Sequence, residues 1–298
     1  MRTVLSLLLT LALLPGAAEA QKKKKKKSEE EITQTLEVIP DPPAAVTVET
    51  ARVEYLVSPL SAKGLLSQQV RDALKALRSQ AGGRAILKIR AFVAGTGDQR
   101  RVQSIVAETF AEKKQAVPAV ATIQVGLLPM EGAQVVLEAV VAAKRPVNPS
   151  GLGFLSGMGG VGPDGPEKLL PMLDKAIADL TKAARLAGSE PSDVMRVTCL
   201  LSALDTIGEV RTRVAAAFPG AVLTAVQAQR LHDKALAECE AVVRLRTKPA
   251  GTLVMLNPPE MNPSPAYSKG ALVGSDKVIF TGSQMAFQAE EKDVHLAF

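Results

Sequence analysis

The chain has 298 residues, a length that favours two compact domains over one. Apolar residues make up 47% of it, enough to fill hydrophobic cores, but there is no tryptophan and only 3% of residues are aromatic, so these cores must be aliphatic. The formal net charge is +6, and the lysine run from Lys22 to Lys27 accounts for that excess. The rest of the chain is close to neutral, which argues against a basic nucleic-acid-binding surface outside the run.

Residues 1–20 have the features of an export signal. Arg2 supplies the positive charge, Val4–Leu14 the apolar segment, and residues 18–20 (Ala-Glu-Ala) the cleavage site. The apolar segment is shorter than the roughly 20 residues that span a bilayer, so a signal peptide is favoured over a membrane anchor, which stays the alternative. We expect cleavage before Gln21 and export to the periplasm or the extracellular space.

Residues 21–45 are predicted to be a charged, disordered tail and linker. The run Lys22–Lys27 could contact nucleic acid or an anionic membrane surface. A solvated tail is favoured, because no aromatic or Gly-Arg pattern accompanies the lysines. We therefore expect at most a weak contact with anionic surfaces and no specific nucleic-acid partner.

Residues 46–142 show the pattern of a first α+β unit. Its expected elements are a strand at Val53–Val57, a helix carrying Val70, Ala73, Leu74 and Leu77 and ending near Gly82-Gly83, a strand at Ile86–Val93, a helix capped by Asp98, and closing strands at Thr122–Leu128 and Gln134–Ala142.

Residues 146–246 repeat that element order. The expected elements are a helix with an apolar stripe from Leu169 to Ala187 and Gly188 as its C-cap, a strand at Val194–Leu201, a helix with Asp205 as N-cap, and strands at Leu223–Leu231 and Leu236–Leu245. LEAVV at Leu137–Val141 corresponds to CEAVV at Cys239–Val243, at a separation of roughly 100 residues that suits tandem small domains. The predicted fold class is α+β, each unit a mixed sheet with two helices on one face.

Three segments of the second unit, together with the helix that Asp205 is expected to cap, resemble the Rid (YjgF) family. They are FLSG (Phe154–Gly157), AGSEPSDVMRVTCLL (Ala187–Leu201) and AECEAVV (Ala237–Val243), and the first unit matches more loosely. The resemblance implies tandem chorismate-mutase-like units, the first of them degenerate. It also implies ligand clefts between units, since family members are usually homotrimers.

Residues 263–298 resemble the start of a third unit, following a linker at 247–262. SPAYSKG is similar to the Pro-Tyr segment of the family, and VIFTGSQ (Val278–Gln284) to its Ser-Gly-Gln strand. This stretch holds a strand without the helices and strands that would cover it, so we expect Val278–Gln284 to be frayed, and the chain to be a fragment of a three-unit protein that closes into a pseudo-trimer. Docking on a sheet edge of another unit is the alternative.

The activity that the resemblance implies is hydrolysis of reactive enamines and imines, without metal or organic cofactor. This chemistry needs an arginine to hold the substrate carboxylate and an acidic group to position water. The family's arginine position falls on Val120 in the first unit and Leu223 in the second. The acidic position falls on Val136 and Glu238. Glu238 is therefore the single candidate catalytic residue. The alternative is that Glu238 has no site role and is a strand residue that faces solvent.

The resemblance also assigns ligand-binding residues. The family's Ser-Gly pair is Ser156-Gly157 in the second unit, and its Pro-Tyr aromatic is Tyr267 in the third. Because no unit has the whole set, we predict an exported tandem protein that binds a small molecule or a partner at inter-unit clefts, with degenerate or altered catalysis. An enamine/imine deaminase acting through Glu238 is the alternative, and a structural module tethered by its tail is a third hypothesis.

Two further sequence features give little support for a functional site. GMGGVG at Gly157–Gly162 fits the dinucleotide pattern G-x-G-x-x-G, but residues 163–166 separate it from a helix, so a hairpin loop is favoured. His232 and His295 are too few for a catalytic zinc site, which needs about three protein ligands.

The two cysteines, Cys199 and Cys239, fall on predicted strands of one unit. Export would permit a disulfide. Two buried free thiols are favoured, because disulfide geometry is demanding. The side chain of Cys239 is expected to point toward the helices, because its neighbour Glu238 points the other way.

Overall fold

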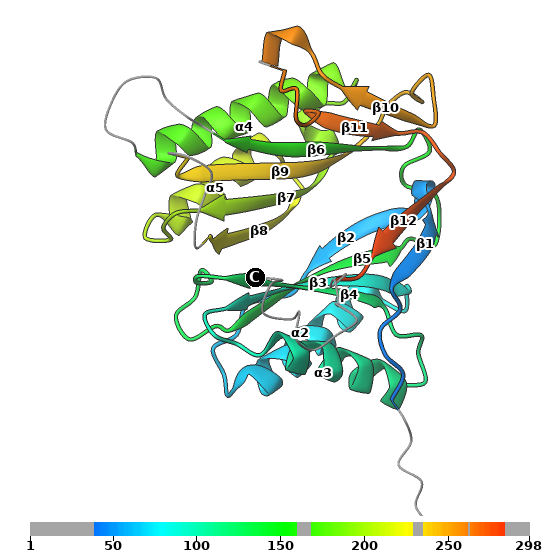
Figure 1. The fold of residues 1–298 in the computed structure, drawn as a ribbon, viewed down its shortest axis with the longest axis vertical. Helices are drawn as coiled ribbons and strands as arrows, with labels where there is room; N and C mark the ends of the chain where they lie inside the picture. The colour runs from blue at the N-terminus through cyan, green and yellow to red at the C-terminus, as the bar shows by residue number, and fades with distance from the viewer. Residues whose placement is uncertain (1–38, 160–167, 229–234, 262, 284–298) are drawn as a thin grey trace, which may run out of the picture. The chain divides into compact units, whose positions relative to one another are not determined.

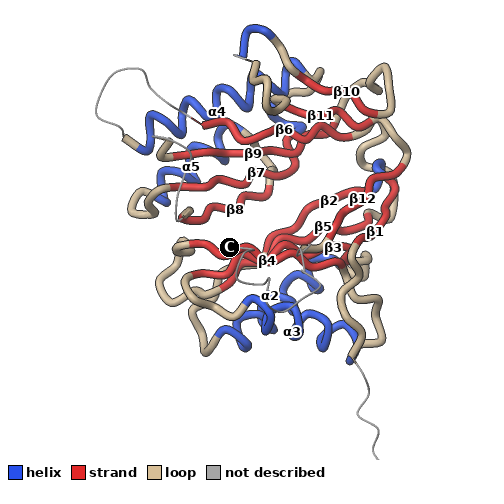
Figure 2. The backbone as a smooth tube through the Cα atoms, viewed as in Figure 1, coloured by secondary structure: helices blue, strands red, loops and turns tan. Residues whose placement is uncertain are grey.

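The structure is a computed structural model that describes residues 39–159, 168–228, 235–261 and 263–283. It has two layers, each a sheet with two helices on one face, and we call them the N-terminal and C-terminal layers (Figures 1 and 2). The N-terminal layer holds β2 (Val53–Val57), α2 (Leu66–Ala81), β3 (Ile86–Ala94), α3 (Gln99–Glu112), β4 (Ala119–Val125) and β5 (Val135–Ala142). The C-terminal layer holds β6 (Leu152–Gly159), α4 (Leu169–Leu186), β7 (Val194–Leu201), α5 (Ile207–Ala217), β8 (Val222–Gln227) and β9 (Ala237–Arg244), with β10 (Leu253–Leu256) and β11 (Gly270–Val273) added.

Both layers have one strand topology. The four-stranded sheet has the order β2-β5-β3-β4, and the six-stranded sheet has the order β10-β11-β6-β9-β7-β8. In each layer the strands joined by the second helix are parallel and the other neighbours are antiparallel. The order β2-β5-β3-β4 of the N-terminal layer corresponds strand for strand to β6-β9-β7-β8 of the C-terminal layer. The predicted mixed sheets with helices on one face are confirmed.

Local signals explain where several helices begin and end. Asp98 caps α3 as predicted, its Oδ1 accepting from the amides of Arg100 and Arg101 at 2.9 and 3.2 Å. Gly82 ends α2 with φ of +56°, a conformation that suits glycine. The prediction for Asp205 is wrong: α5 starts at Ile207 with Thr206 as N-cap, because the carbonyls of Leu204 and Thr206 take its first amides.

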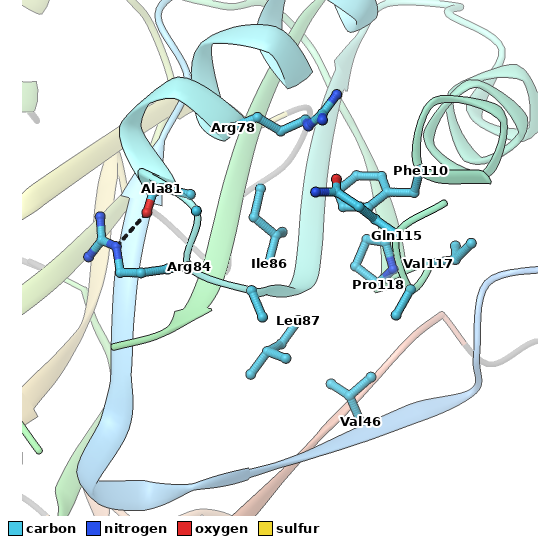
Figure 3. A pocket seen from close by; sticks show the side chains of 13 residues that line it. Val46, Arg78, Ala81, Arg84, Ile86, Leu87, Phe110, Gln115, Val117 and Pro118 are labelled. Carbon is cyan, nitrogen blue, oxygen red and sulfur yellow. Dashed lines mark hydrogen bonds between the residues drawn. The ribbon is translucent and has the colours of Figure 1, made fainter. Parts of the chain in front are cut away.

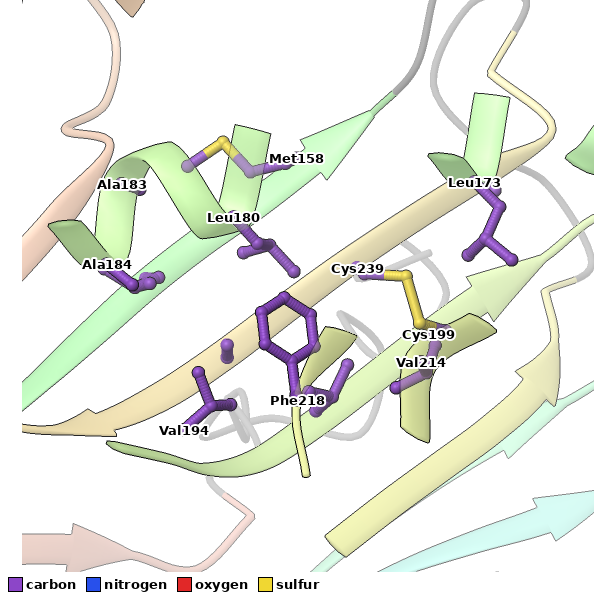
Figure 4. Close-up of a cluster of buried hydrophobic side chains, with 14 of the residues drawn as sticks. Met158, Leu173, Leu180, Ala183, Ala184, Val194, Cys199, Val214, Phe218 and Cys239 are labelled. Carbon is purple, nitrogen blue, oxygen red and sulfur yellow. A yellow bond between two sulfur atoms is a disulfide. The ribbon is translucent and has the colours of Figure 1, made fainter. Parts of the chain in front are cut away.

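The core of the C-terminal layer is aliphatic, as the composition requires. Figure 4 shows α4 packed over β6 and β9, with Leu180, Met158 and Phe218 among the buried side chains. Cys199 and Cys239 lie in this core and form a disulfide, so the prediction of free thiols is wrong. They are direct partners in the β7–β9 ladder with Cα atoms 4.2 Å apart, a placement that only the strand register decides.

The segment that resembles a third unit is docked on other strands. β11 pairs with β6, and β10, which lies inside the predicted linker, pairs with β11. β12 (Lys277–Thr281) pairs along its whole length with β1 (Ala45–Glu49). The expected fraying is therefore wrong for residues 278–281, because free strand edges supply their backbone partners. Gln284 lies outside the described residues. Three 3-10 turns complete the fold: η1 (Thr50–Arg52), η2 (Pro191–Asp193) and η3 (Pro259–Met261).

Candidate functional site

A pocket of about 350 Å³ lies between the two layers, at the free edge of β8. Its volume is within the range of small-molecule sites. The N-terminal layer contributes Val57, Ser58, Pro59, Leu60, Pro129, Met130 and Val136, and the C-terminal layer contributes Arg211, Leu223, Thr224 and Ala225. We call it the inter-layer pocket.

Two positions to which the resemblance assigned chemical groups lie in this pocket. Val136 stands at the acidic position of the first unit, and Leu223 at the arginine position of the second. Ser58 and Pro59 line the same space. Val120, the other arginine position, is instead buried in the N-terminal core with 3% of its surface exposed. Val136 and Leu223 thus give the pocket apolar side chains at the two positions where the resemblance would place an acid and an arginine.

Three polar side chains give this pocket its remaining chemistry. The buried hydroxyl of Thr224 has no hydrogen-bond partner among the described residues. Ser58 Oγ accepts from the Leu137 amide at 3.0 Å, and no acceptor in the described part of the chain takes its own proton. Arg211 is exposed, and its guanidinium makes no ion pair or hydrogen bond within the described ranges. Two hydroxyls and one cation are therefore available to a ligand.

The edge of β8 offers backbone groups as well. The amide and carbonyl of Gln227 bond outward, to the Leu127 carbonyl at 2.9 Å and the Gly126 amide at 2.8 Å. Because strand residues alternate in direction, the backbone groups of Leu223 and Ala225 point to the same side of β8. Both residues line the pocket, so a ligand there lies against an open strand edge.

Glu238, Ser156 and Gly157 come together in the C-terminal layer. Glu238 lies over Gly157, where a Cβ would meet its Oε1 at 1.9 Å, so any larger residue at 157 would displace that carboxylate. Glu238 itself has no hydrogen bond or ion pair among the described residues. The hydroxyl of Ser156 donates to the Ser268 carbonyl at 2.6 Å and is therefore a structural link to the chain before β11.

Tyr267 is brought to the same sheet region, one residue from that link. Its side chain is 53% exposed and makes a cation–π contact with Lys269, whose Nζ lies 5.1 Å from the ring centre. The predicted site residues Glu238, Gly157, Ser156 and Tyr267 thus lie on three neighbouring strands or their ends. The sequence analysis placed the first three in the second unit and Tyr267 in the third, and the docking of β11 on β6 brings Tyr267 to the others.

A charged cluster between the layers was missed by the sequence analysis. The Arg90 Nη2 is 2.6 Å from Glu138 Oε2, and its Nη1 is 3.1 Å from Glu240 Oε1. Arg196 reaches Glu240 at 2.7 Å, and Thr198 donates to Glu138 at 3.0 Å. Burial acts to lower the pKa of Arg90, but Glu138 and Glu240 outweigh it and hold that pKa above its ordinary value.

The LEAVV and CEAVV repeat carried the signal for this cluster, because it places Glu138 and Glu240 at equivalent positions. The cluster joins the layers through Arg90–Glu240 and Thr198–Glu138, and none of its residues lines the inter-layer pocket.

Other sequence predictions fall outside the described residues. These are the signal peptide, Lys22–Lys27, His232, His295 and residues 160–162 of the Gly157–Gly162 motif. Within the described ranges, no helix is long and apolar enough to cross a membrane. The same ranges contain no group of three His, Cys, Asp or Glu side chains placed to hold a metal ion.

Comparison with known proteins gives structural similarity only. No family model matches the chain, and no curated protein matches it. Similar solved structures include a putative endoribonuclease L-PSP from Entamoeba histolytica, at 24% identity over 32% of this chain and 80% of that one, with a TM-score of 0.29. A Rid-family protein of unknown function from Yersinia pestis has 24% identity over 34% and 83% of the two chains, with the same TM-score.

A member of the YjgF/YER057c/UK114 family from Mycobacterium tuberculosis has 22% identity over 32% of this chain and 79% of that chain, with a TM-score of 0.28. The chain has a mixed α+β fold, and the structures to which about a third of it is similar are those of the YjgF/Rid/L-PSP family.

Proposed function

We propose that this chain binds a small 2-oxo acid with an apolar side chain in the inter-layer pocket, and that it does so without turning it over. One observation carries the proposal: Val136 and Leu223, the residues at the acidic and arginine positions of the resemblance, line a single pocket. A site that keeps its space but has Val136 in place of the acid is suited to binding, because no acidic group at that position can activate water.

The ligand class follows from the groups around the pocket. Arg211 can bind a carboxylate, and guanidinium–carboxylate pairs are strong because they form two parallel hydrogen bonds. The hydroxyls of Ser58 and Thr224 can donate to a carbonyl oxygen, and Val57, Leu60 and Met130 supply an apolar wall. A 2-oxo acid has all three parts, and it is the product class of imine hydrolysis.

The organisation and location of the protein are part of this proposal. The matching strand order of the two layers supports two Rid-type units in tandem, with the inter-layer pocket as the cleft between them. The disulfide between Cys199 and Cys239 supports export, because disulfides persist mainly in oxidising compartments. The mature chain would then begin at Gln21, which intact-mass measurement of exported protein would test.

Calorimetry with 4-methyl-2-oxopentanoate tests the binding. We expect one site per chain, and a loss of roughly tenfold or more in affinity for Arg211→Gln, because a hydrogen-bonded charge pair is removed. Arg213→Gln is the matched control, since Arg213 lies on the same helix but pairs with Asp174. Absence of binding to the wild type, or equal losses in both variants, would contradict the proposal.

A deaminase that acts through Glu238 is the second candidate. The unpartnered carboxylate of Glu238 beside Ser156 and Gly157 favours it, because a general base must be free to reach water. Its test is hydrolysis of a 2-imino acid generated from leucine. We expect little or no turnover, and a rate near that of an ordinary enzyme, roughly 10 per second, that is lost in Glu238→Gln would establish the deaminase.

A further inference from the structure

A second and larger pocket lies entirely within the N-terminal layer and its β1 neighbour. Its volume is about 470 Å³, and it opens between the ends of α2 and α3 and the start of β3 (Figure 3). The wall is mostly apolar, formed by Val46, Ala81, Ile86, Leu87, Phe110, Val117 and Pro118. No residue assigned by the resemblance lines it, so it is independent of the proposed function.

Two arginines line this pocket, but only one of them is free. Arg84 is fully engaged: its Nε donates to the Ala81 carbonyl at 2.7 Å, its Nη2 donates to the Gln80 carbonyl at 2.8 Å, and its Nη1 pairs with Glu54. Arg78 makes no side-chain hydrogen bond or ion pair within the described residues. Figure 3 shows its side chain directed from α2 toward Phe110 and Gln115.

Arg78 lies in the last turn of α2, where a basic residue often caps the helix, but its contacts do not support that role. Basic residues in a last turn often bond to the free carbonyls of the helix. Here Arg84 bonds to two carbonyls of that turn, and Gly82 closes the helix with its own amide. Arg78 is therefore left half-buried beside an apolar cavity with its charge uncompensated.

The chemistry of the lining selects the ligand. No acidic residue lines the pocket, so a cationic ligand would find Arg78 repulsive and no partner. The carboxamide of Gln115 can donate a hydrogen bond next to Arg78, and the floor of Ile86, Phe110 and Pro118 excludes water from an apolar chain. A wall of this kind with one cation at its rim fits an amphipathic anion.

We propose that this pocket binds a monocarboxylate with an apolar body, with its carboxylate on Arg78 and its body against Ile86 and Phe110. The probe is octanoate, measured by calorimetry on the full chain, with octanol and octylamine as ligands of equal length. We expect octanoate to bind once per chain and roughly tenfold or more tighter than octanol, and octylamine to bind most weakly.

Variants locate the site. Arg78→Gln should reduce octanoate affinity to that of octanol, whereas Lys75→Gln, which removes a charge from an exposed site one turn earlier on α2, should not change it. Arg211→Gln should also leave octanoate affinity unchanged. The proposal is overturned if octanoate does not bind, if octanol binds equally well, if Arg78→Gln has no effect, or if the loss follows Arg211 instead.

Discussion

The two layers share a strand order but differ at their first strands. In the C-terminal layer the outer edge of β6 is covered by β11, which β10 covers in turn. In the N-terminal layer β2 is an edge of its sheet, and it comes close to β8, the edge of the other sheet. The inter-layer pocket opens beside these two edges. One topology thus has its first strand covered by another strand in the C-terminal layer and uncovered, beside the inter-layer pocket, in the N-terminal layer.

The last strands of the layers differ in their charges. β5 carries one glutamate, Glu138, which is 4% exposed and fully engaged between Arg90 and Thr198. β9 carries two, and only Glu240 is engaged with the same cluster. Glu238 is left without a partner among the described residues. The C-terminal layer therefore keeps one glutamate, Glu238, without a partner among the described residues. The glutamate of β5, Glu138, is engaged in the cluster that joins the layers.

The largest expected effect is on the charged cluster that joins the layers. In Glu138→Gln, Arg90 and Arg196 would have to share Glu240 alone, and an uncompensated buried charge costs about 3–5 kcal/mol. Urea unfolding would measure the loss. Asp179→Asn is the control, because it breaks a partly exposed pair with Lys175 and should cost about 0.5 kcal/mol or less. Equal urea midpoints for the two variants would show that the cluster does not stabilise the packing of the two layers.

Sequence patterns that lie within a single helix or strand predicted several elements of the two layers well. The bounds of β2 and β7 match the predicted strands, and the Asp98 cap is present, because strand alternation and capping depend on neighbouring residues. The bounds of β4 were less accurate: it begins at Ala119 and not at Thr122, since its ladder with β3 starts there.

What the sequence missed depends on residues far apart in the chain. The Cys199–Cys239 bond requires the register of β7 on β9, and the docking of β11 requires a free edge on β6. The availability of Arg211 and Thr224 to a ligand depends on which partners they lack, and no sequence pattern encodes a missing partner.

A smaller effect concerns pH and the residue at the centre of the interface. Burial raises the pKa of Tyr55 to about 12, against the opposing influence of Arg196. The unfolded chain ionises this tyrosine near pH 10, whereas the folded chain keeps its proton to about pH 12. The contribution of this group to the free energy of unfolding is complete below pH 10 and is lost as the pH rises through that window, by up to about 3 kcal/mol.

Tyr55→Phe removes this pH dependence. Urea unfolding from neutral pH to about pH 11 should show a shallower decline than in the wild type. At neutral pH the variant should be at least as stable, because the Tyr55 hydroxyl is buried and has no hydrogen-bond partner among the described residues. Tyr267→Phe is the control at an exposed site. A decline as steep in Tyr55→Phe as in Tyr267→Phe would assign the alkaline loss to other groups.

The smallest expected effect tests the docking of β12 on β1, since docking of this segment was only the alternative in the sequence analysis. Phe280 is half-buried and packs with the cluster of Val48, Val53 and Tyr55, so Phe280→Ala should cost about 1–2 kcal/mol, less than a fully buried phenylalanine would. Ile279 is 62% exposed on the other face of the strand, and Ile279→Ala should change stability by about 0.5 kcal/mol or less. Amide exchange gives the second measurement, with slow exchange expected for the β12 ladder because β1 pairs with all five of its residues. Fast exchange at Val278, together with equal effects of the two substitutions, would mean that β12 frays in solution and that the edge of β1 is open.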